Sequence, residues 1–255
     1  MQERAIRLTA RVAGLAATIL LCTLFSYGSS DAAANAKNSS AKDRGFSRYV
    51  DPFIGVDGNG NVFPGPTLPF GVVKLGPDTD QNGNAGYTSS GRILGFSHLH
   101  VSGTGGGPKY GVVLVMPTTG PLESSEYGSD RADESASVEY YSVELVRYNV
   151  KAELTASRRV GFHRYTFNNA GESHILIDVG HFLLSSFKPE SQHFVGGKIV
   201  FSSSNQVEGY GRYAGGWNLG REYKVYFCSM FDTPVHGSRY LERPENPAGK
   251  KLRRR

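Results

Sequence analysis

Cysteine is nearly absent from this 255-residue chain, which holds only Cys22 and Cys228. Cys22 falls in an N-terminal segment that has the pattern of a removable leader, so a mature exported chain would keep one thiol and form no internal disulfide. No amphipathic helical pattern follows the leader, and no Gly-x-Ser-x-Gly elbow of a serine hydrolase is present. The glycine run at 103–107 lacks the Lys-Ser/Thr pair of a phosphate loop. Without an internal disulfide, stability must come from packing.

A basic stripe is also missing, although the net charge is +5 and the isoelectric point is near 9.1. Residues 1–36 and the last six residues of the chain carry the excess of positive charge, so the body between them is close to neutral. Nucleic acid is therefore not expected as a partner.

The N-terminal segment has the three parts of a secretory signal peptide. An apolar run at 12–25 follows the basic residues Arg4, Arg7 and Arg11, and small residues at 34–36 offer a cleavage site. The run is shorter than the roughly 20 residues of a spanning helix, which disfavours the alternative of a membrane anchor. We predict a signal peptide at 1–36.

Two further expectations follow from this leader. A lipid anchor at Cys22 is disfavoured because Leu21 stands where a small residue is expected. Residues 37–45 are rich in Ser, Asn and Lys, as in a flexible linker. The mature protein is expected to be secreted or periplasmic, with no membrane contact after signal cleavage.

Strand-like patterns dominate the chain from residue 46 onward. Residues 148–154 alternate apolar and polar side chains with a period of two. Apolar or β-branched runs separated by turn residues recur at 71–75, 111–116, 138–147, 160–167, 174–179, 198–201 and 223–231. Many short strands without helices between them indicate an all-β fold, either an antiparallel β-sandwich or a barrel, and we favour the sandwich.

The predicted domain covers residues 46–240 and begins with a loop-rich third at about 50–109, where Gly, Pro and aromatic residues occur at fixed offsets. Such loops build rigid, shaped surfaces, as sugar sites often require. An irregular basic tail follows at 241–255. The acidic residues between 123 and 134, including Glu134, have the pattern of a solvated loop.

His98 and His100 are the most conspicuous candidates for chemistry. In an extended chain they point to the same side, which suits a zinc site if a third ligand lies elsewhere. Two other interpretations stay open. One imidazole can satisfy buried backbone groups, or one or both can bind a polar ligand such as a sugar hydroxyl. Asp78 belongs to an incomplete calcium-loop pattern that is better explained by an Asx turn.

An ordered series of N-terminal motifs resembles the N-terminal domain of glycoside hydrolase family 92. These motifs are DPFIG at 51–55, FPG at 63–65, PFG at 69–71, GY at 86–87, GFSH at 95–98 and SGTG at 102–105. Later segments at 155–167, 175–180 and 226–234 are similar to strands of that domain. After Pro234 the sequence departs from the family pattern, which suggests a truncation.

The resemblance implies an exported, calcium-dependent exo-α-mannosidase that acts with inversion on α-mannoside glycans. In that family this β-sandwich packs against a larger C-terminal (α/α)6 domain, which carries the acid, the base and most calcium ligands. We therefore expect no catalytic residue and no bound calcium in this chain, no activity of the chain alone, and an exposed apolar face where the partner domain would sit.

The resemblance also suggests substrate-binding residues. Tyr87 would stack on a sugar near the leaving-group side, and polar or glycine positions would line the pocket beside it: Gly86, His98, His100, Ser102, Gly103, Thr104 and Gly105. These glycines can equally serve only to shape the turns. The alternative function is a stand-alone carbohydrate-binding or protein-interaction module without catalysis.

Overall fold

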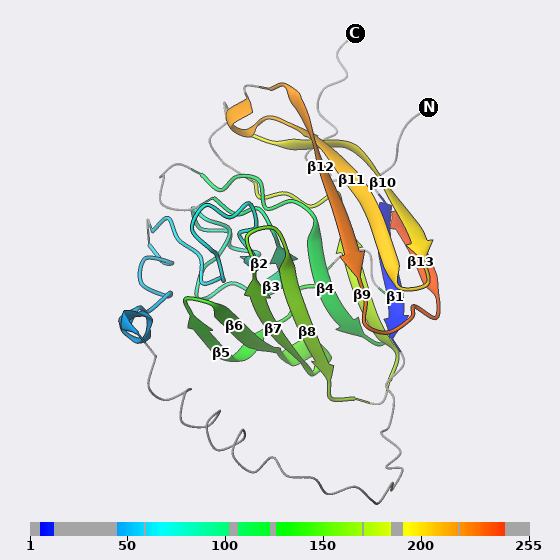
Figure 1. Cartoon of the computed structure of the whole chain (residues 1–255), viewed down its shortest axis with the longest axis horizontal. Coiled ribbons are helices and arrows are strands. Elements are labelled where there is room, and N and C mark those ends of the chain that lie inside the picture. Colours follow the sequence, from blue (N-terminus) through cyan, green and yellow to red (C-terminus); the bar gives the residue numbers. More distant parts are fainter. Residues whose placement is uncertain are drawn as a thin grey trace, which may run out of the picture.

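The computed structural model describes residues 6–12, 45–58, 60–101, 107–122, 126–169, 171–184, 191–218 and 220–242. The described residues form three antiparallel sheets joined by loops and short 3-10 helices (Figure 1). The all-β prediction is confirmed. Among these residues, no helix has the length and apolar character needed to cross a membrane.

The middle sheet has six strands in the order β13-β1-β9-β4-β3-β2. Their bounds are Ile6–Val12 for β1, Gly76–Thr79 for β2, Ile93–Ser97 for β3, Leu114–Thr119 for β4, Ser173–Asp178 for β9 and Ser238–Glu242 for β13. Every pairing in this sheet is antiparallel. Strands that are distant in sequence, such as β4 and β9, therefore lie side by side.

The second sheet is a meander of four strands. It contains β5 at Arg131–Ser137, β6 at Tyr140–Leu145, β7 at Val150–Ala156 and β8 at Gly161–Phe167. A short 3-10 helix and Asn149, which has a left-handed φ of 50°, connect β6 to β7. The alternation seen at 148–154 is therefore that of a real strand, with Val150, Ala152 and Leu154 all buried.

The third sheet has three strands, namely β10 at His193–Ser203, β11 at Gln206–Ala214 and β12 at Glu222–Met230. Partly buried and exposed residues alternate along all of β12, as expected for a sheet with one covered face. Two further 3-10 helices lie at Phe46–Tyr49 (η1) and Gly216–Asn218 (η4).

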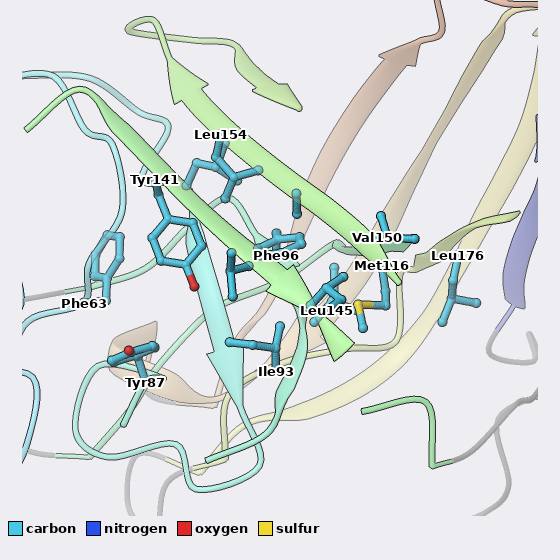
Figure 2. Packing of buried hydrophobic residues seen from close by; sticks show 14 of the residues in the cluster. Phe63, Tyr87, Ile93, Phe96, Met116, Tyr141, Leu145, Val150, Leu154 and Leu176 are labelled. Carbon is cyan, nitrogen blue, oxygen red and sulfur yellow. The ribbon is translucent and has the colours of Figure 1, made fainter. Parts of the chain in front are cut away.

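The middle sheet lies between the other two, so the molecule has two hydrophobic cores. Leu176 of β9 packs into the core shared with the four-stranded sheet, where Phe96, Met116 and Tyr141 also lie (Figure 2). Ile175 and Ile177 of the same strand pack into the other core, beside the three-stranded sheet. The predicted sandwich therefore has three layers rather than two, because β9 contributes side chains to both cores.

The loop-rich first third lies at one end of these layers, before and between β2, β3 and β4 (Figure 1). Glycine is required there for close approach of the backbone. A Cβ on Gly65 would lie 2.0 Å from the Leu75 carbonyl oxygen, so no larger residue fits. The strand expected at 71–75 is wrong: this segment makes only isolated bridges, and β2 begins at Gly76.

Residues 1–36 were predicted as a leader and residues 37–45 as a linker. Cleavage of the chain after the leader stays a prediction. Within the leader, the structure describes Ile6–Val12 as β1, between β9 and β13. The described part resumes at Gly45, where η1 follows, and the last strand ends at Glu242.

Candidate functional site

The loop-rich end holds a buried carboxylate between two imidazoles. Asp78, in β2, accepts a hydrogen bond from His100 Nε2 at 2.5 Å on one oxygen and from His181 Nε2 at 2.7 Å on the other. Asp78 is fully buried, and the exposed fractions of His100 and His181 are 1% and 5%. Burial by itself would raise the pKa of Asp78, but the charge and hydrogen bonds of the imidazoles lower it to about 2. Asp78 is therefore a buried anion, not part of the predicted solvated Asx turn.

His100 must carry hydrogen on both ring nitrogens in this arrangement. Its Nδ1 faces the Lys74 carbonyl oxygen at 2.9 Å and its Nε2 faces the Asp78 carboxylate. Both partners only accept, so both nitrogens donate and the ring is an imidazolium. The Phe63 ring stacks on it with centroids 4.3 Å apart. His100 therefore forms a buried ion pair and has no free nitrogen for a metal or a sugar.

His98 belongs to a second, separate set. Its Nδ1 donates to the Val113 carbonyl oxygen at 3.3 Å, which leaves Nε2 as an acceptor for His163 Nε2 at 2.9 Å. His163 Nδ1 then accepts from the Tyr165 hydroxyl at 2.7 Å. Each hydrogen in this series of hydrogen bonds therefore has a single position, and all three side chains are neutral.

The pKa values of the second set agree with neutral rings. Burial lowers the pKa of His98 to about 4, with a smaller contribution from the charge of His100. Burial, followed by the neighbouring His98, also holds the pKa of His163 well below its usual range. His98 and His100 therefore point to different partners, and the open alternative of buried, satisfied histidines describes both of them.

Tyr87 lies in the core and not on a surface. Its exposed fraction is 0%, and Figure 2 shows the ring among the buried side chains. Its hydroxyl donates to Glu134 at 2.9 Å, and Tyr141 donates to the same oxygen at 2.6 Å. Arg131 lies over the Tyr87 ring, 4.9 Å from its centroid. Stacking on a sugar would require this ring to leave the core.

Glu134 was wrongly predicted to belong to a solvated loop. It accepts hydrogen bonds from two buried tyrosines, and burial followed by its charge raises the pKa of Tyr87. A register shift in β5 between Ala132 and Ser135 interrupts the regular alternation of side chains at this position. No local sequence pattern signals this, because the partners of Glu134 come from other segments.

Gly86 has a structural reason for its identity. Its φ is 93°, and a Cβ there would lie 2.7 Å from Leu183 and 3.2 Å from the His100 ring. This glycine therefore lets His100 pack closely. The remaining predicted pocket residues, Ser102, Gly103, Thr104 and Gly105, lie outside the described residues.

The described residues do not form a calcium or zinc site. Calcium takes six to eight oxygen ligands, whereas both oxygens of Asp78 already accept hydrogen bonds from imidazoles. No group of three or more His, Cys, Asp or Glu side chains in the described ranges is placed to hold a metal ion. Calcium in a complete enzyme stays a prediction.

The loop-rich end also exposes large apolar side chains. Phe70 is fully exposed, with a left-handed φ of 59°, and Val72 is 64% exposed. The Val72 amide donates to the Arg158 carbonyl oxygen at 2.8 Å, which brings this loop against the β7–β8 turn and the half-exposed Val160. We call Phe70, Val72 and Val160 the loop patch. That a second domain covers an apolar face of this chain stays a prediction.

Comparison with known proteins identifies the family. Residues 49–254 match the model of the glycosyl hydrolase family 92 N-terminal domain. The chain belongs to this family. The family 92 α-mannosidase BT3965 from Bacteroides thetaiotaomicron has a similar fold, with a TM-score of 0.68 and 35% sequence identity over 75% of this chain. The same enzyme in complex with mannoimidazole aligns equally well.

Two further comparisons agree. The family 92 glycosyl hydrolase ccman5 aligns with a TM-score of 0.58 and 26% identity over 72% of this chain. An uncharacterized secreted glycosidase from Arthroderma benhamiae is 32% identical over 150 residues, 52% of this chain. The chain spans only 19% of the length of that glycosidase and 26% of each solved relative.

Proposed function

We propose that this chain is the N-terminal domain of an exported α-mannosidase that removes terminal α-mannosyl residues from glycans, with the reactive groups supplied by a C-terminal domain. The observation that carries the proposal is the 35% identity and matching fold to an α-mannosidase over three quarters of the chain. The leader at 1–36 supports export, as does the secreted relative.

The carboxylates of the described residues support catalysis elsewhere. Glycoside hydrolysis needs two carboxyl groups facing each other across the bond, one of them protonated near neutral pH. Asp78, Glu153 and Asp178 are the buried acids, and each is already bonded inside the protein. Bonds from Arg164 and Tyr140 lower the pKa of Glu153 to about 2, so it cannot serve as the acid.

The chain's own contribution is a rigid wall. The ion pair of Asp78 and His100 fixes the backbone directly before Val101, and the loop patch offers an apolar surface to a second domain. In this proposal Ser102 and Thr104 reach the sugar, while Tyr87 and His100 support the wall from inside. Mannoside glycans and a C-terminal helical domain are thus the proposed partners, and calcium binds in that domain.

A domain exchange tests the proposal. Residues 46–242 of this chain would replace the N-terminal quarter of the Bacteroides α-mannosidase, and hydrolysis of an aryl α-mannoside would be measured with calcium. We expect turnover by the chimera, none by the enzyme with that quarter deleted, and none by this chain alone. Turnover by this chain alone would refute the proposal, and so would a folded chimera that binds calcium but has no activity.

A stand-alone glycan-binding module is the second candidate, and the outer face of the three-stranded sheet favours it. Tyr226 is 70% exposed and is paired across the strands with Tyr210, with ring centroids 5.7 Å apart. Lys224 lies over the Tyr210 ring at 5.2 Å. Exposed aromatic faces can stack on sugars, so glycan binding that is lost in Tyr226→Ala but kept in the loop-patch variant Phe70→Ala would favour this candidate.

A further inference from the structure

The position of β1 in the middle sheet is the starting observation. Ile6–Val12 lies between β9 and β13 and pairs antiparallel with both, from Arg7 opposite Asp178 to Val12 opposite Ser173 on one side. Neighbouring strands in a sheet lie about 4.8 Å apart, so β9 and β13 are separated by two spacings, roughly 10 Å. If β1 leaves, a gap that is one strand wide opens between β9 and β13, and we call this gap the lane.

Strand β9 needs a neighbour in this lane. All six of its residues are buried, its other edge is paired with β4 along its whole length, and its side chains enter both cores. An unpaired edge would leave buried backbone N–H and C=O groups without hydrogen-bond partners, which folded proteins avoid. Within the described sheet, β13 has β1 as its neighbour, so it too would lose its pairing.

The current occupant is the basic part of the predicted leader. Arg7 and Arg11 lie directly before the apolar run at 12–25, so the same residues serve as a signal in one state and as a strand in the other. A leader peptidase that cuts near residue 36 would release β1 from the covalent chain. Strand β1 is therefore the one strand that export would remove.

We propose that the lane between β9 and β13 is a strand-binding site, which Ile6–Val12 fills only until processing. Its later occupant is an extended, largely uncharged segment of about seven residues, donated by polypeptide from outside residues 1–255. It runs antiparallel to β9, and main-chain hydrogen bonds give most of the affinity. The proposal rests on the leader prediction and does not depend on α-mannosidase activity.

Features of the lane determine the chemistry of this occupant. Its residues lie opposite Ile175 and Ile177 on the face of one core and opposite Leu176 on the face of the other, so both of its faces meet apolar side chains. The solved relatives are about four times longer than the aligned segment, so family 92 chains contain ample polypeptide to donate. A second copy of this chain, processed in the same way, would have lost its own Ile6–Val12.

The experiment uses the full chain with a protease recognition sequence built into the linker at 37–44. After purification the chain is cut there, and hydrogen exchange of β9 and β13 is followed while acetylated seven-residue peptides are added. The probes are Ile-Arg-Leu-Thr-Ala-Arg-Val and Val-Thr-Val-Thr-Val-Thr-Val, each with a control that has proline at its centre. We expect the cut chain to release residues 1–36 when the valine peptide is in excess and to bind that peptide one to one.

Two uncut variants test the strand itself. Thr9→Pro removes an amide in the middle of β1, opposite Leu176 and Arg239, whereas Ser40→Pro changes only the linker. We expect Thr9→Pro to speed exchange in β9 and β13 by about tenfold or more while β7 stays protected, and Ser40→Pro to change neither. Equal exchange in both variants would overturn the proposal. So would a cut chain that keeps β9 protected without residues 1–36, that binds the proline controls equally well, or that fills the lane by dimerising.

Discussion

His98 and His100 are two residues apart, yet they end in opposite electrostatic states. His98 lies in a neutral set, in which the Tyr165 hydroxyl donates to His163, His163 donates to His98, and His98 donates to the Val113 carbonyl oxygen. His100 is an imidazolium paired with the buried Asp78 carboxylate. Because both rings are buried, the comparison shows that burial alone does not decide the charge of a histidine. The number of acceptors that face its two nitrogens does.

Removing the Asp78 carboxylate should have the largest effect on the free energy of unfolding. In Asp78→Asn the amide oxygen can accept from only one imidazole, and its NH2 group faces the N–H of the other. Breaking a buried charge pair in this way costs about 3–5 kcal/mol, which urea unfolding followed by circular dichroism would measure.

The matched control for this change is Asp80→Asn. Asp80 also pairs with a cation, Arg92 at 2.9 Å, but the two side chains are 30% and 43% exposed. The expected loss there is about 0–1 kcal/mol. Equal losses in the two variants would show that Asp78 is not a buried ion pair.

The neutral set should make the protein acid-sensitive in a defined range. The folded pKa of His98 is about 4, against about 6.5 in an unfolded chain, so between these values the unfolded state binds more protons. The free energy of unfolding should therefore fall as pH decreases from about 6.5 to 4, by on the order of 3 kcal/mol. The Asp78 pair contributes over that whole range and is lost only as pH falls from about 3.8 toward 2.

Urea unfolding at a series of pH values would check this acid-sensitive range, with His163→Gln as the comparison variant. Glutamine does not titrate, and burial also lowers the pKa of His163, so the variant should lose less stability between pH 6.5 and 4. An identical decline in both proteins would mean that the neutral set does not cause the acid sensitivity.

The smallest expected effect comes from replacing one histidine of each set by glutamine. Glutamine has one donor end and one acceptor end, like a neutral imidazole, so His163→Gln should cost within about 1 kcal/mol at pH 7.5. His100→Gln should cost about 2 kcal/mol or more, because its oxygen must face either Lys74 O or Asp78. The same urea measurement checks both, and an inverted order would contradict the assigned protonation states.

Much of the fold could be predicted from the sequence, because strand patterns are local. The alternation at 148–154 corresponds to β7, and the run at 174–179 to β9. Strands β5 and β11 were missed, since β5 is polar and β11 contains glycines where a strand usually has branched residues. The third layer could not be seen, because nothing local shows that β9 faces two cores.

The candidate site was predictable only in part. The His98 and His100 pair stood out by spacing, but the residues that determine their states are distant: His163 is 65 positions from His98, and His181 is 103 positions from Asp78. Tyr87 was placed on a sugar by its motif, whereas its hydroxyl bonds to Glu134 across 47 positions. Only the folded chain brings such partners together.

Strand β9 has a consequence for how the protein unfolds. Its side chains belong to both cores, and its long-range pairing with β4 links residues 173–178 to residues 114–119. Loss of one core therefore disturbs the other through a shared backbone, and the three layers should melt together in one cooperative transition. The same topology requires contacts between residues that are far apart in the sequence. Such contacts form slowly, so we expect the protein to fold slowly as well as to unfold cooperatively.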